Sequence, residues 1–269
     1  STLSSSSAAS DVYKRQYEFL PANLNKLVTH NLLFDFTLPT TYTGVGAEIA
    51  TGKWLFKSMV GNMNTARKGP QNRWPAFAYR GDYARGEFTG FGFSGVHGKA
   101  VNFADPNGND SFLNLFEVDG WYTRGDLTLM GQVSYGRQNA AAITPDPNGV
   151  PRTASWYGMS ALAGYKLTPR LEAISRLDFI NNKRNGGGLL GFTAADDRNG
   201  IGPDPFGDPE IGANRTALSF GLNYLLNENT QLKAEYRLDR ASQPVFLDVA
   251  NGTYRKSNNL FATQIVVFW

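Results

Sequence analysis

Apolar and polar residues alternate along most of the chain from residue 42 onward, with the two-residue period of a β-strand. In the clearest segment, from Thr216 to Leu226, every second residue after Thr216 is apolar or aromatic, and most of those between are small or polar. In the next segment, Lys, Glu, Arg and Asp occupy alternate positions of residues 233–239. A face with four successive charges cannot pack in a dry core, so we expect it in water and the opposite face in lipid or protein.

The same alternation predicts about eleven strands of about ten residues, the length that a tilted membrane strand needs. They lie near residues 42–50, 53–62, 77–83, 87–96, 116–122, 127–135, 157–165, 171–179, 216–226, 231–239 and 261–269. Residues 17–40 do not follow the alternation. We expect them to form a folded-in loop with one or two helical turns; a strand running to Pro39 is the alternative.

The connections between these strands alternate between short and long from Thr51 onward. A soluble sandwich has no reason to keep this parity, whereas a membrane barrel has short turns on its periplasmic side and long loops outside. The sequence therefore predicts an all-β fold, an antiparallel up-and-down transmembrane β-barrel with eleven or twelve visible strands. The short connections lie at 51–52, 85–86, 124–125, 167–169 and 227–229, and the long ones near 64–73, 97–110, 137–153, 182–213 and 241–257.

Composition narrows this picture without changing it. The 269 residues include no cysteine, which excludes a disulfide framework and a thiolate metal site. The net charge of +3 is spread along the chain, without the basic block that would indicate nucleic acid. No apolar run approaches the roughly 20 residues of a membrane-spanning helix. This excludes a helical membrane protein but not a membrane barrel, whose strands are half polar.

The first sixteen residues differ from the rest. Residues 1–16 are rich in serine and low in complexity, so we treat them as a non-native or disordered segment and assign residues 17–269 to the barrel. They contain no apolar stretch of the kind found in a signal peptide. Bacterial barrels usually have an even number of strands. We therefore expect an incomplete, larger barrel, truncated at its N-terminus.

The chain ends on an aromatic residue within its last predicted strand. Phe261, Ile265, Val267 and Trp269 fall on alternate positions. This ending resembles the C-terminal assembly signal of bacterial outer-membrane β-barrels, although the usual last residue is Phe rather than Trp. The resemblance implies that the barrel assembly machinery recognises the chain.

Several longer segments resemble a porin-like family of outer-membrane proteins from Gram-negative bacteria. They include LLFDFTLPTTYTGVG at residues 32–46, AAITPDPNG at 141–149, NNKRNGGGLLG at 181–191 and RNGIGPDP at 198–205. The family is distantly similar to the phosphate-selective and related trimeric porins. The resemblance implies a barrel in the bacterial outer membrane, in contact with its lipid, with small solutes as partners and a possible homotrimer. It implies no particular substrate.

Charged residues on the polar faces of the strands are the candidate pore-lining residues. Along residues 233–239 they predict either a ladder of ion pairs or a field across a pore. Arg176, Arg215 and Arg237 fall on neighbouring strands, which predicts an anion-attracting patch or arginines paired with nearby carboxylates. The candidates are Arg80, Asp82, Glu117, Asp119, Glu172, Arg176, Asp178, Arg215, Lys233, Glu235, Arg237 and Asp239.

Aromatic residues near the predicted strand ends are expected to form girdles at the two membrane interfaces. The alternative is the general preference of strands for aromatic residues. The candidates are Tyr42, Trp54, Trp74, Tyr79, Tyr122, Tyr135, Tyr157, Tyr165 and Tyr224.

No catalytic, cofactor or metal site is expected. His30 and His97 lack metal-ligand spacing. The acidic segment 195–210 has no EF-hand spacing and is expected to be a solvated loop rather than a calcium site. Residues 186–188 are three glycines without the Lys-Ser/Thr of a phosphate loop.

These features predict a passive outer-membrane channel for small polar or anionic solutes. The alternative is a non-channel barrel that acts as an adhesin or scaffold through its external loops. A membrane-embedded hydrolase is the third possibility, and the scarcity of histidine argues against it.

Overall fold

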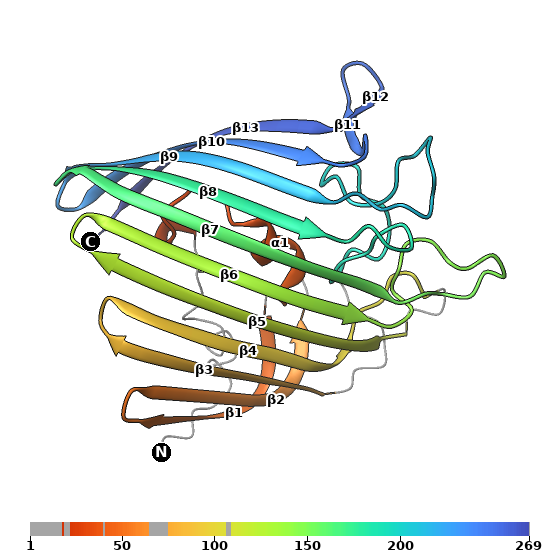
Figure 1. The fold of residues 1–269 in the computed structure, drawn as a ribbon, viewed down its shortest axis with the longest axis horizontal. Coiled ribbons are helices and arrows are strands. Elements are labelled where there is room, and N and C mark those ends of the chain that lie inside the picture. The colour runs from red at the N-terminus through yellow and green to blue at the C-terminus, as the bar shows by residue number, and fades with distance from the viewer. Residues whose placement is uncertain (1–17, 19–21, 40, 65–74, 106–108, 269) are drawn as a thin grey trace.

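The structure of the chain is a single curved sheet with an inner segment on its concave side (Figure 1). The computed structural model describes residue 18 and residues 22–39, 41–64, 75–105 and 109–268. In this part of the chain, eleven antiparallel strands pair in the order β1 to β10 and then β13. A separate hairpin of β11 and β12 lies between β10 and β13 in sequence.

The eleven strands of the sheet confirm the predicted segments. Most are longer than predicted by a few residues, chiefly on the side of the long connections, where pairing continues beyond the alternating segment. The sheet consists of β1 (Thr41–Thr51), β2 (Trp54–Asn64), β3 (Ala76–Gly86), β4 (Thr89–Ala100), β5 (Ser111–Arg124), β6 (Leu127–Gln138), β7 (Ala154–Thr168), β8 (Leu171–Asn181), β9 (Arg215–Asn227), β10 (Thr230–Ala241) and β13 (Ser257–Val267). The hairpin consists of β11 (Phe246–Asp248) and β12 (Thr253–Arg255).

Short and long connections alternate, as predicted. The five short turns gather at one end of the sheet, on the left in Figure 1, and we call this the turn end. The long connections gather at the opposite end, which we call the loop end. Gly52 and Gly125 close two of the turns with φ of +57° and +56°, a backbone conformation that glycine adopts without strain.

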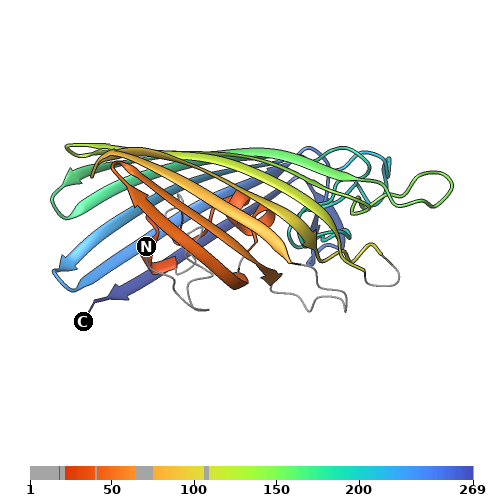
Figure 2. The ribbon, with the colours of Figure 1, turned by 90° about the horizontal axis from the view of Figure 1, so that it is seen from below.

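The two faces of the sheet differ in polarity. On β9, Phe220 is 54% exposed on the convex face, while Ser219 is fully buried on the concave face. The convex side chains are mostly apolar and the concave ones polar, charged or small. Figure 2 shows the sheet as a curved trough with this concave side turned inward. The structure thus confirms the alternation from which the fold was predicted.

The described sheet is open at both edges. Within the described residues, β1 pairs only with β2, and β13 pairs only with β10. None of the helices in this part of the chain is long and apolar enough to cross a membrane. Residues 1–16, Trp74 and Trp269 fall outside the described residues, so the expectations about them are not addressed.

Residues 22–38 form the inner segment, which lies on the concave side of the sheet (Figures 1 and 2). It contains the 3₁₀ turn η2 (Ala22–Leu24) and the helix α1 (Leu32–Thr37). Asn31 caps α1, because its side-chain oxygen accepts a hydrogen bond from the amide of Phe34 at 2.7 Å. The structure confirms the folded-in loop with helical turns and excludes the strand to Pro39.

The inner segment is anchored by an apolar cluster as well as by polar contacts. Leu32 and Leu33 of α1 are fully buried and pack with Trp156 of β7 and Ile180 of β8. We call the concave face of the sheet the wall. The inner segment comes close to the wall at glycine positions. A Cβ added at Gly158 would lie 3.1 Å from a methyl of Leu33.

Most of the aromatic residues predicted for the interfaces lie on the convex face near strand ends. Tyr79, Tyr135 and Tyr157 lie towards the loop end, and Trp54, Tyr122, Tyr165 and Tyr224 towards the turn end. Tyr42 differs from the prediction. It is 5% exposed and packs in a cluster on the concave side, because it lies on the buried side of β1.

Candidate pore-lining site

The twelve candidate pore-lining residues all lie on the concave face of the sheet. Eleven of them are at most 6% exposed, and the side chain of Glu172 is 14% exposed. They form two groups on the wall. One group, on β3 and β5, comprises Arg80, Asp82, Glu117 and Asp119. The other, on β8 to β10, comprises Glu172, Arg176, Asp178, Arg215, Lys233, Glu235, Arg237 and Asp239.

An Arg-x-Asp pair recurs on the concave face of three strands. The Nε of Arg80 donates to Asp82 at 2.9 Å, that of Arg176 to Asp178 at 3.1 Å, and that of Arg237 to Asp239 at 3.0 Å. Residues two apart on a strand point to the same face, so each aspartate can orient its arginine. At least one terminal nitrogen of each guanidinium then reaches a partner outside its own strand.

Two of these arginines converge on the inner segment. Arg176 on β8 and Arg237 on β10 are both in register with Ser219 of β9, which separates them. Both donate to the backbone carbonyl of His30, at 2.9 Å and 3.0 Å. Both also donate to the hydroxyl of Thr29, at 3.1 Å and 3.4 Å. We call this pair of arginines the arginine clamp.

Arg176 uses all five of its N–H donors. Besides Asp178, His30 and the Thr29 hydroxyl, it donates to the Thr29 carbonyl at 2.8 Å and to Glu18 at 2.7 Å. Such saturation offsets the cost of burying a guanidinium away from water. The position of the Arg176 side chain is rigid, because every nitrogen of its planar guanidinium donates a hydrogen bond.

Two carboxylates complete the contacts around Thr29. Glu235 accepts from the amide of Thr29 and from its hydroxyl, both at 2.7 Å. Glu18 accepts from the amide of Asn31 at 2.6 Å. Burial raises the pKa of Glu18 to about 8, although the guanidinium of Arg176 acts to lower it.

A second anchor lies nearer the turn end. Lys233 donates to the backbone carbonyls of Asn23 and Asn25. Lys26 of the inner segment forms an ion pair with Glu172 of β8, and its carbonyl accepts from Asn223 at 2.8 Å. The lysine of β10 thus binds the backbone of the inner segment.

These contacts agree only in part with the ladder expected along β10. Among the four charged residues at 233–239, Arg237 and Asp239 pair with each other at 2.9 Å. Asp239 also pairs with Arg215 of β9 at 3.1 Å, and Glu235 with Arg176 of β8 at 3.8 Å. Lys233 and Glu235 in addition bind the inner segment. Alternation placed the four charges on one face correctly. It gave no information about the segment that lies over them.

The group on β3 and β5 is held by a bidentate ion pair. Arg80 donates from its two terminal nitrogens to the two oxygens of Asp119, at 2.6 Å and 2.9 Å. Asp82 binds the same guanidinium, and the side chains of all three are at most 2% exposed. This group is rich in carboxylates, because Glu117 lies on the same face.

Arg215 joins the wall to the loops. It donates to Asp239 at 3.1 Å and to the carbonyl of Asn199 in the long connection between β8 and β9. Its guanidinium lies 5.5 Å from the ring of Phe36 and 4.9 Å from that of Phe246. Each arginine of the predicted anion patch is therefore paired with an aspartate.

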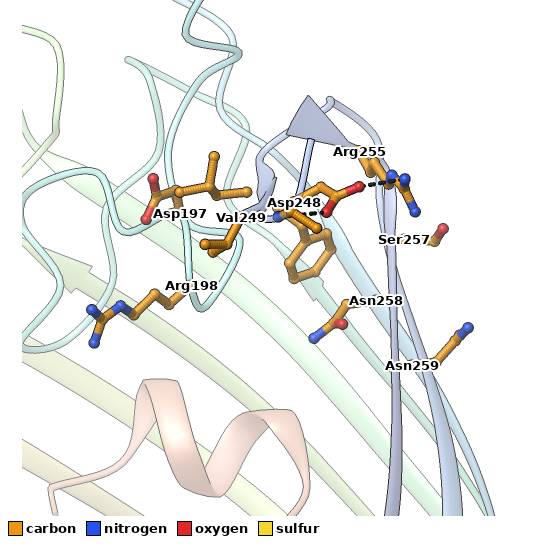
Figure 3. A pocket seen from close by; sticks show the side chains of 11 residues that line it. Asp197, Arg198, Asp248, Val249, Arg255, Ser257, Asn258 and Asn259 are labelled. Carbon is orange, nitrogen blue, oxygen red and sulfur yellow. Dashed lines mark hydrogen bonds and ion pairs between the residues drawn. The ribbon is translucent and has the colours of Figure 1, made fainter. Parts of the chain in front are cut away.

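A polar hollow of about 470 Å³ opens among the loops at the loop end (Figure 3). The hairpin of β11 and β12 borders it, with Asp248 and Arg255 joined by an ion pair. Asp197 lies on the opposite side of the hollow (Figure 3) and accepts a hydrogen bond from the hydroxyl of Tyr254 of β12 at 3.3 Å. Asn258 of β13 lies alongside (Figure 3). The hollow gives the loop end a mixed-charge, polar surface.

Sequence reasoning missed Glu18 and the residues of the inner segment that contact the wall. Glu18, Lys26, Thr29 and Asn31 lie in an irregular stretch, where no periodicity marks a functional face. One signal was available on the wall itself. The sequence RLD occurs at 176–178 and again at 237–239, and RGD occurs at 80–82. Within the described residues, no group of three or more His, Cys, Asp or Glu side chains is arranged to hold a metal ion.

The chain matches one protein family over nearly its whole length. The family is described as "Putative beta-barrel porin-2, OmpL-like", and the match covers residues 16–268. Among curated proteins, none is similar enough in sequence to count as a relative.

Solved outer-membrane proteins share the fold at low sequence identity. Outer-membrane expressed OmpT of Vibrio cholerae is 13% identical with a TM-score of 0.58, over 99% of this chain and 75% of that one. Its loop L8 deletion mutant is 14% identical with a TM-score of 0.53, over 96% and 72%. The anion-selective porin from Comamonas acidovorans is 9% identical with a TM-score of 0.55, over 85% and 58%. At such identities the likeness shows the fold alone.

Proposed function

The chain belongs to the beta-barrel porin-2, OmpL-like family of the bacterial outer membrane, and we propose that it forms a passive channel for small polar or anionic solutes. The observation that carries the proposal is the polar concave face. Charged side chains line it on β3, β5, β8, β9 and β10, while the convex face is apolar. A barrel with this polarity encloses a path for water and solutes.

The charges of the wall favour weak ion selectivity. The candidate pore-lining residues comprise five cations and seven anions. The arginines of β8 to β10 are each paired with an aspartate, which reduces the field that they project into a pore. We propose that neutral polar solutes and small anions both pass, without a strong preference for anions.

The inner segment narrows this path. It lies against the charged wall of β8 to β10 and is held there by the arginine clamp, by Glu235 and by Lys233. A solute must pass beside the inner segment or wait until it moves. We therefore expect small currents rather than those of a wide, open porin.

Planar lipid bilayers test the proposal directly. The purified, folded chain is expected to produce discrete, small current steps, with a reversal potential close to zero across a gradient of potassium chloride. Proteoliposomes should swell in solutions of small neutral sugars. Inserted protein that gives neither current nor swelling would contradict the channel, provided that a heat-dependent mobility shift on a gel shows the barrel to be folded.

The saturated contacts of the inner segment also favour a second candidate, a non-channel barrel that presents its loops. In that case the wall charges would hold the inner segment permanently, and the ordered loops near Asp197 and Asp248 would bind a partner. Binding of whole cells or matrix by the reconstituted protein, without any permeability, would favour this function over the channel.

We also propose a non-enzymatic role. His30 stacks on Phe34 with ring centres 4.3 Å apart, and its Nδ1 lies 3.6 Å from a carboxylate oxygen of Asp35. Nδ1 of His97 lies 2.8 Å from the side-chain oxygen of Asn114. None of these contacts is with a hydroxyl or thiol that could act as a nucleophile.

Assembly partners follow from the last strand. Phe261, Ile265 and Val267 of β13 are 70%, 69% and 52% exposed on the convex face. We propose that the barrel assembly machinery recognises this apolar row and that outer-membrane lipid covers it afterwards. A homotrimer is also proposed, and native mass spectrometry of the detergent-extracted protein would show three copies if it forms.

A further inference from the structure

The convex face carries three ordered rows of side chains where β6, β7 and β8 reach the loop end. The first row is basic or hydroxylic, the second aromatic or amide, and the third apolar. In the second and third rows the residues are cross-strand neighbours, so their side chains lie next to one another. In the first row Arg137 and Ser155 are cross-strand neighbours, and Lys183 lies just beyond the end of β8. The rows are Arg137, Ser155 and Lys183, which follows β8 by two residues; Tyr135, Tyr157 and Asn181; and Val133, Met159 and Phe179.

This order matches the layers of a membrane surface. Val133 and Met159 are 59% and 46% exposed, as expected of side chains in hydrocarbon. Tyr135 and Tyr157 are 48% and 52% exposed, and tyrosine favours the boundary between hydrocarbon and headgroups. The cations come one row further out, at the level of lipid headgroups.

The cations of the first row are available to a ligand. Arg137, Lys183 and the neighbouring Arg184 are exposed, and none of them takes part in an ion pair within the described residues. The nearby carboxylate of Glu210 is held by Arg152 at 2.6 Å. Three positive charges therefore face outward without a counter-charge of their own.

The same place on the sheet is hollowed. A cavity of about 380 Å³ is lined by Tyr135, Tyr157, Asn181, Lys183 and Arg184, among others. Its lining thus combines three aromatic residues, an amide, a hydroxyl and two cations. Such a lining suits a sugar that bears a phosphate, because the rings pack against the sugar and the cations bind the phosphate.

We propose that this hollow binds the phosphorylated glycolipid of the outer leaflet, with a phosphate of its lipid A on Arg137, Lys183 and Arg184. The long loops of an outer-membrane barrel face outward, so the loop end lies in the leaflet that contains this lipid. The acyl chains then run along the apolar row of Val133 and Met159. The proposal requires the membrane location only and does not depend on whether the barrel conducts.

The experiment compares lipids on the full chain, folded in detergent, by native mass spectrometry. The probes are lipid A with both phosphates, lipid A without phosphates, and phosphatidylglycerol. We expect the phosphorylated lipid A to remain bound when the other two have dissociated. Equal retention of the dephosphorylated form, or of phosphatidylglycerol, would overturn the proposal, because it would mean an unspecific hydrophobic or anionic contact.

A matched pair of variants locates the site. The triple variant Arg137→Gln, Lys183→Gln, Arg184→Gln removes the two cations that line the hollow and the neighbouring Arg137. The control variant Lys53→Gln, Arg85→Gln, Arg124→Gln removes the same charge from exposed positions at the turn end.

We expect the first variant to bind phosphorylated lipid A roughly a hundredfold more weakly, at about 1 kcal/mol per cation, and the control to bind as the natural chain does. An equal loss in both variants would contradict the assignment. If the first variant does not fold, the comparison of lipids on the natural chain still decides whether a phosphate is recognised.

Discussion

Arg176 and Arg237 donate hydrogen bonds to one and the same acceptor, the carbonyl of His30, from two strands that β9 separates. Each arginine is oriented by the aspartate two residues further along its own strand. Two strands of the wall therefore bind the same backbone carbonyl of the inner segment. The consequences of this arrangement can be tested one contact at a time.

Replacing Thr29 by Val should loosen the inner segment. The hydroxyl of Thr29 accepts from both arginines of the clamp and donates to Glu235, and valine offers none of these contacts. Hydrogen bonds to charged groups are worth about 1.5–3 kcal/mol, so amides 29 and 31 should exchange roughly tenfold to a hundredfold faster. Hydrogen exchange read by mass spectrometry measures this.

The control for this change is Thr216→Val on the convex face of β9. It removes the same atoms from a position that does not face the inner segment. Unchanged exchange in the Thr29 variant, or an equal change in the control, would show that the clamp does not hold the inner segment.

Replacing Arg176 by Lys should destabilise the protein although the charge is kept. Lysine has three donors on one nitrogen and cannot satisfy Asp178, Glu18 and the Thr29–His30 backbone together. Breaking a buried ion pair costs about 3–5 kcal/mol, and the retained charge should leave a loss in the lower part of that range. Urea titration of the folded barrel measures it.

Arg170→Lys is the matched control, since Arg170 is exposed in the turn between β7 and β8. If the urea midpoint of unfolding shifts equally in the two variants, the guanidinium of Arg176 makes no specific contribution to stability.

The inner segment should bind more weakly as the pH rises. When the inner segment is docked, the pKa of the Glu18 carboxyl is raised from 4.5 to about 8. Between these two pH values, Glu18 holds a proton in the docked state that it loses when the segment is released. Docking is strongest below pH 4.5, weakens as the pH rises through the window to about 8, and is constant above it. Hydrogen exchange of residues 29–35, corrected for the intrinsic effect of pH, measures docking.

Glu18→Gln should remove most of this pH dependence, because glutamine stays neutral throughout. Burial also raises the pKa of Asp35, against the influence of His30, so a dependence of the same sign should remain. A variant that keeps the full pH dependence would show that another group is responsible.

Placing a charge on the convex face should be costly in a membrane. Phe220 is 54% exposed near the middle of β9, and an arginine at the bilayer midplane costs about 2–4 kcal/mol. Phe220→Arg should therefore lower the stability of the barrel in lipid vesicles. Phe206→Arg, in a loop where Phe206 is 86% exposed, should leave it unchanged. Equal stabilities would contradict a lipid-facing β9.

The strands and their faces could be predicted because alternation reports which side of a strand meets water. Residues 233–239 show both the success and its limit. Their four charges share one face, as predicted, but Lys233 and Glu235 also bind groups of the inner segment that lie more than two hundred residues earlier in the chain. Contacts of this kind depend on how the inner segment folds back, and periodicity carries no information about that.

Tyr42 shows a second limit of sequence reasoning. Position near a strand end suggested an interfacial ring, yet the side chain points to the concave side and packs with Leu38 and Met59. Which face an end residue takes depends on the register of β1 against β2. The glycine-rich sequence of β1 leaves that register poorly marked.

The unitary conductance of Gly221→Leu tests the central claim most directly, namely that the polar concave face is a solute path narrowed by the inner segment. A Cβ at position 221 would lie 2.3 Å from a methyl of Leu27, so a leucine there displaces the inner segment from the wall. We predict larger current steps than those of the natural chain, and unchanged steps for Ala163→Leu on the convex face. Steps of unchanged size in a folded Gly221→Leu barrel, or no steps in any of the three proteins, would contradict the account.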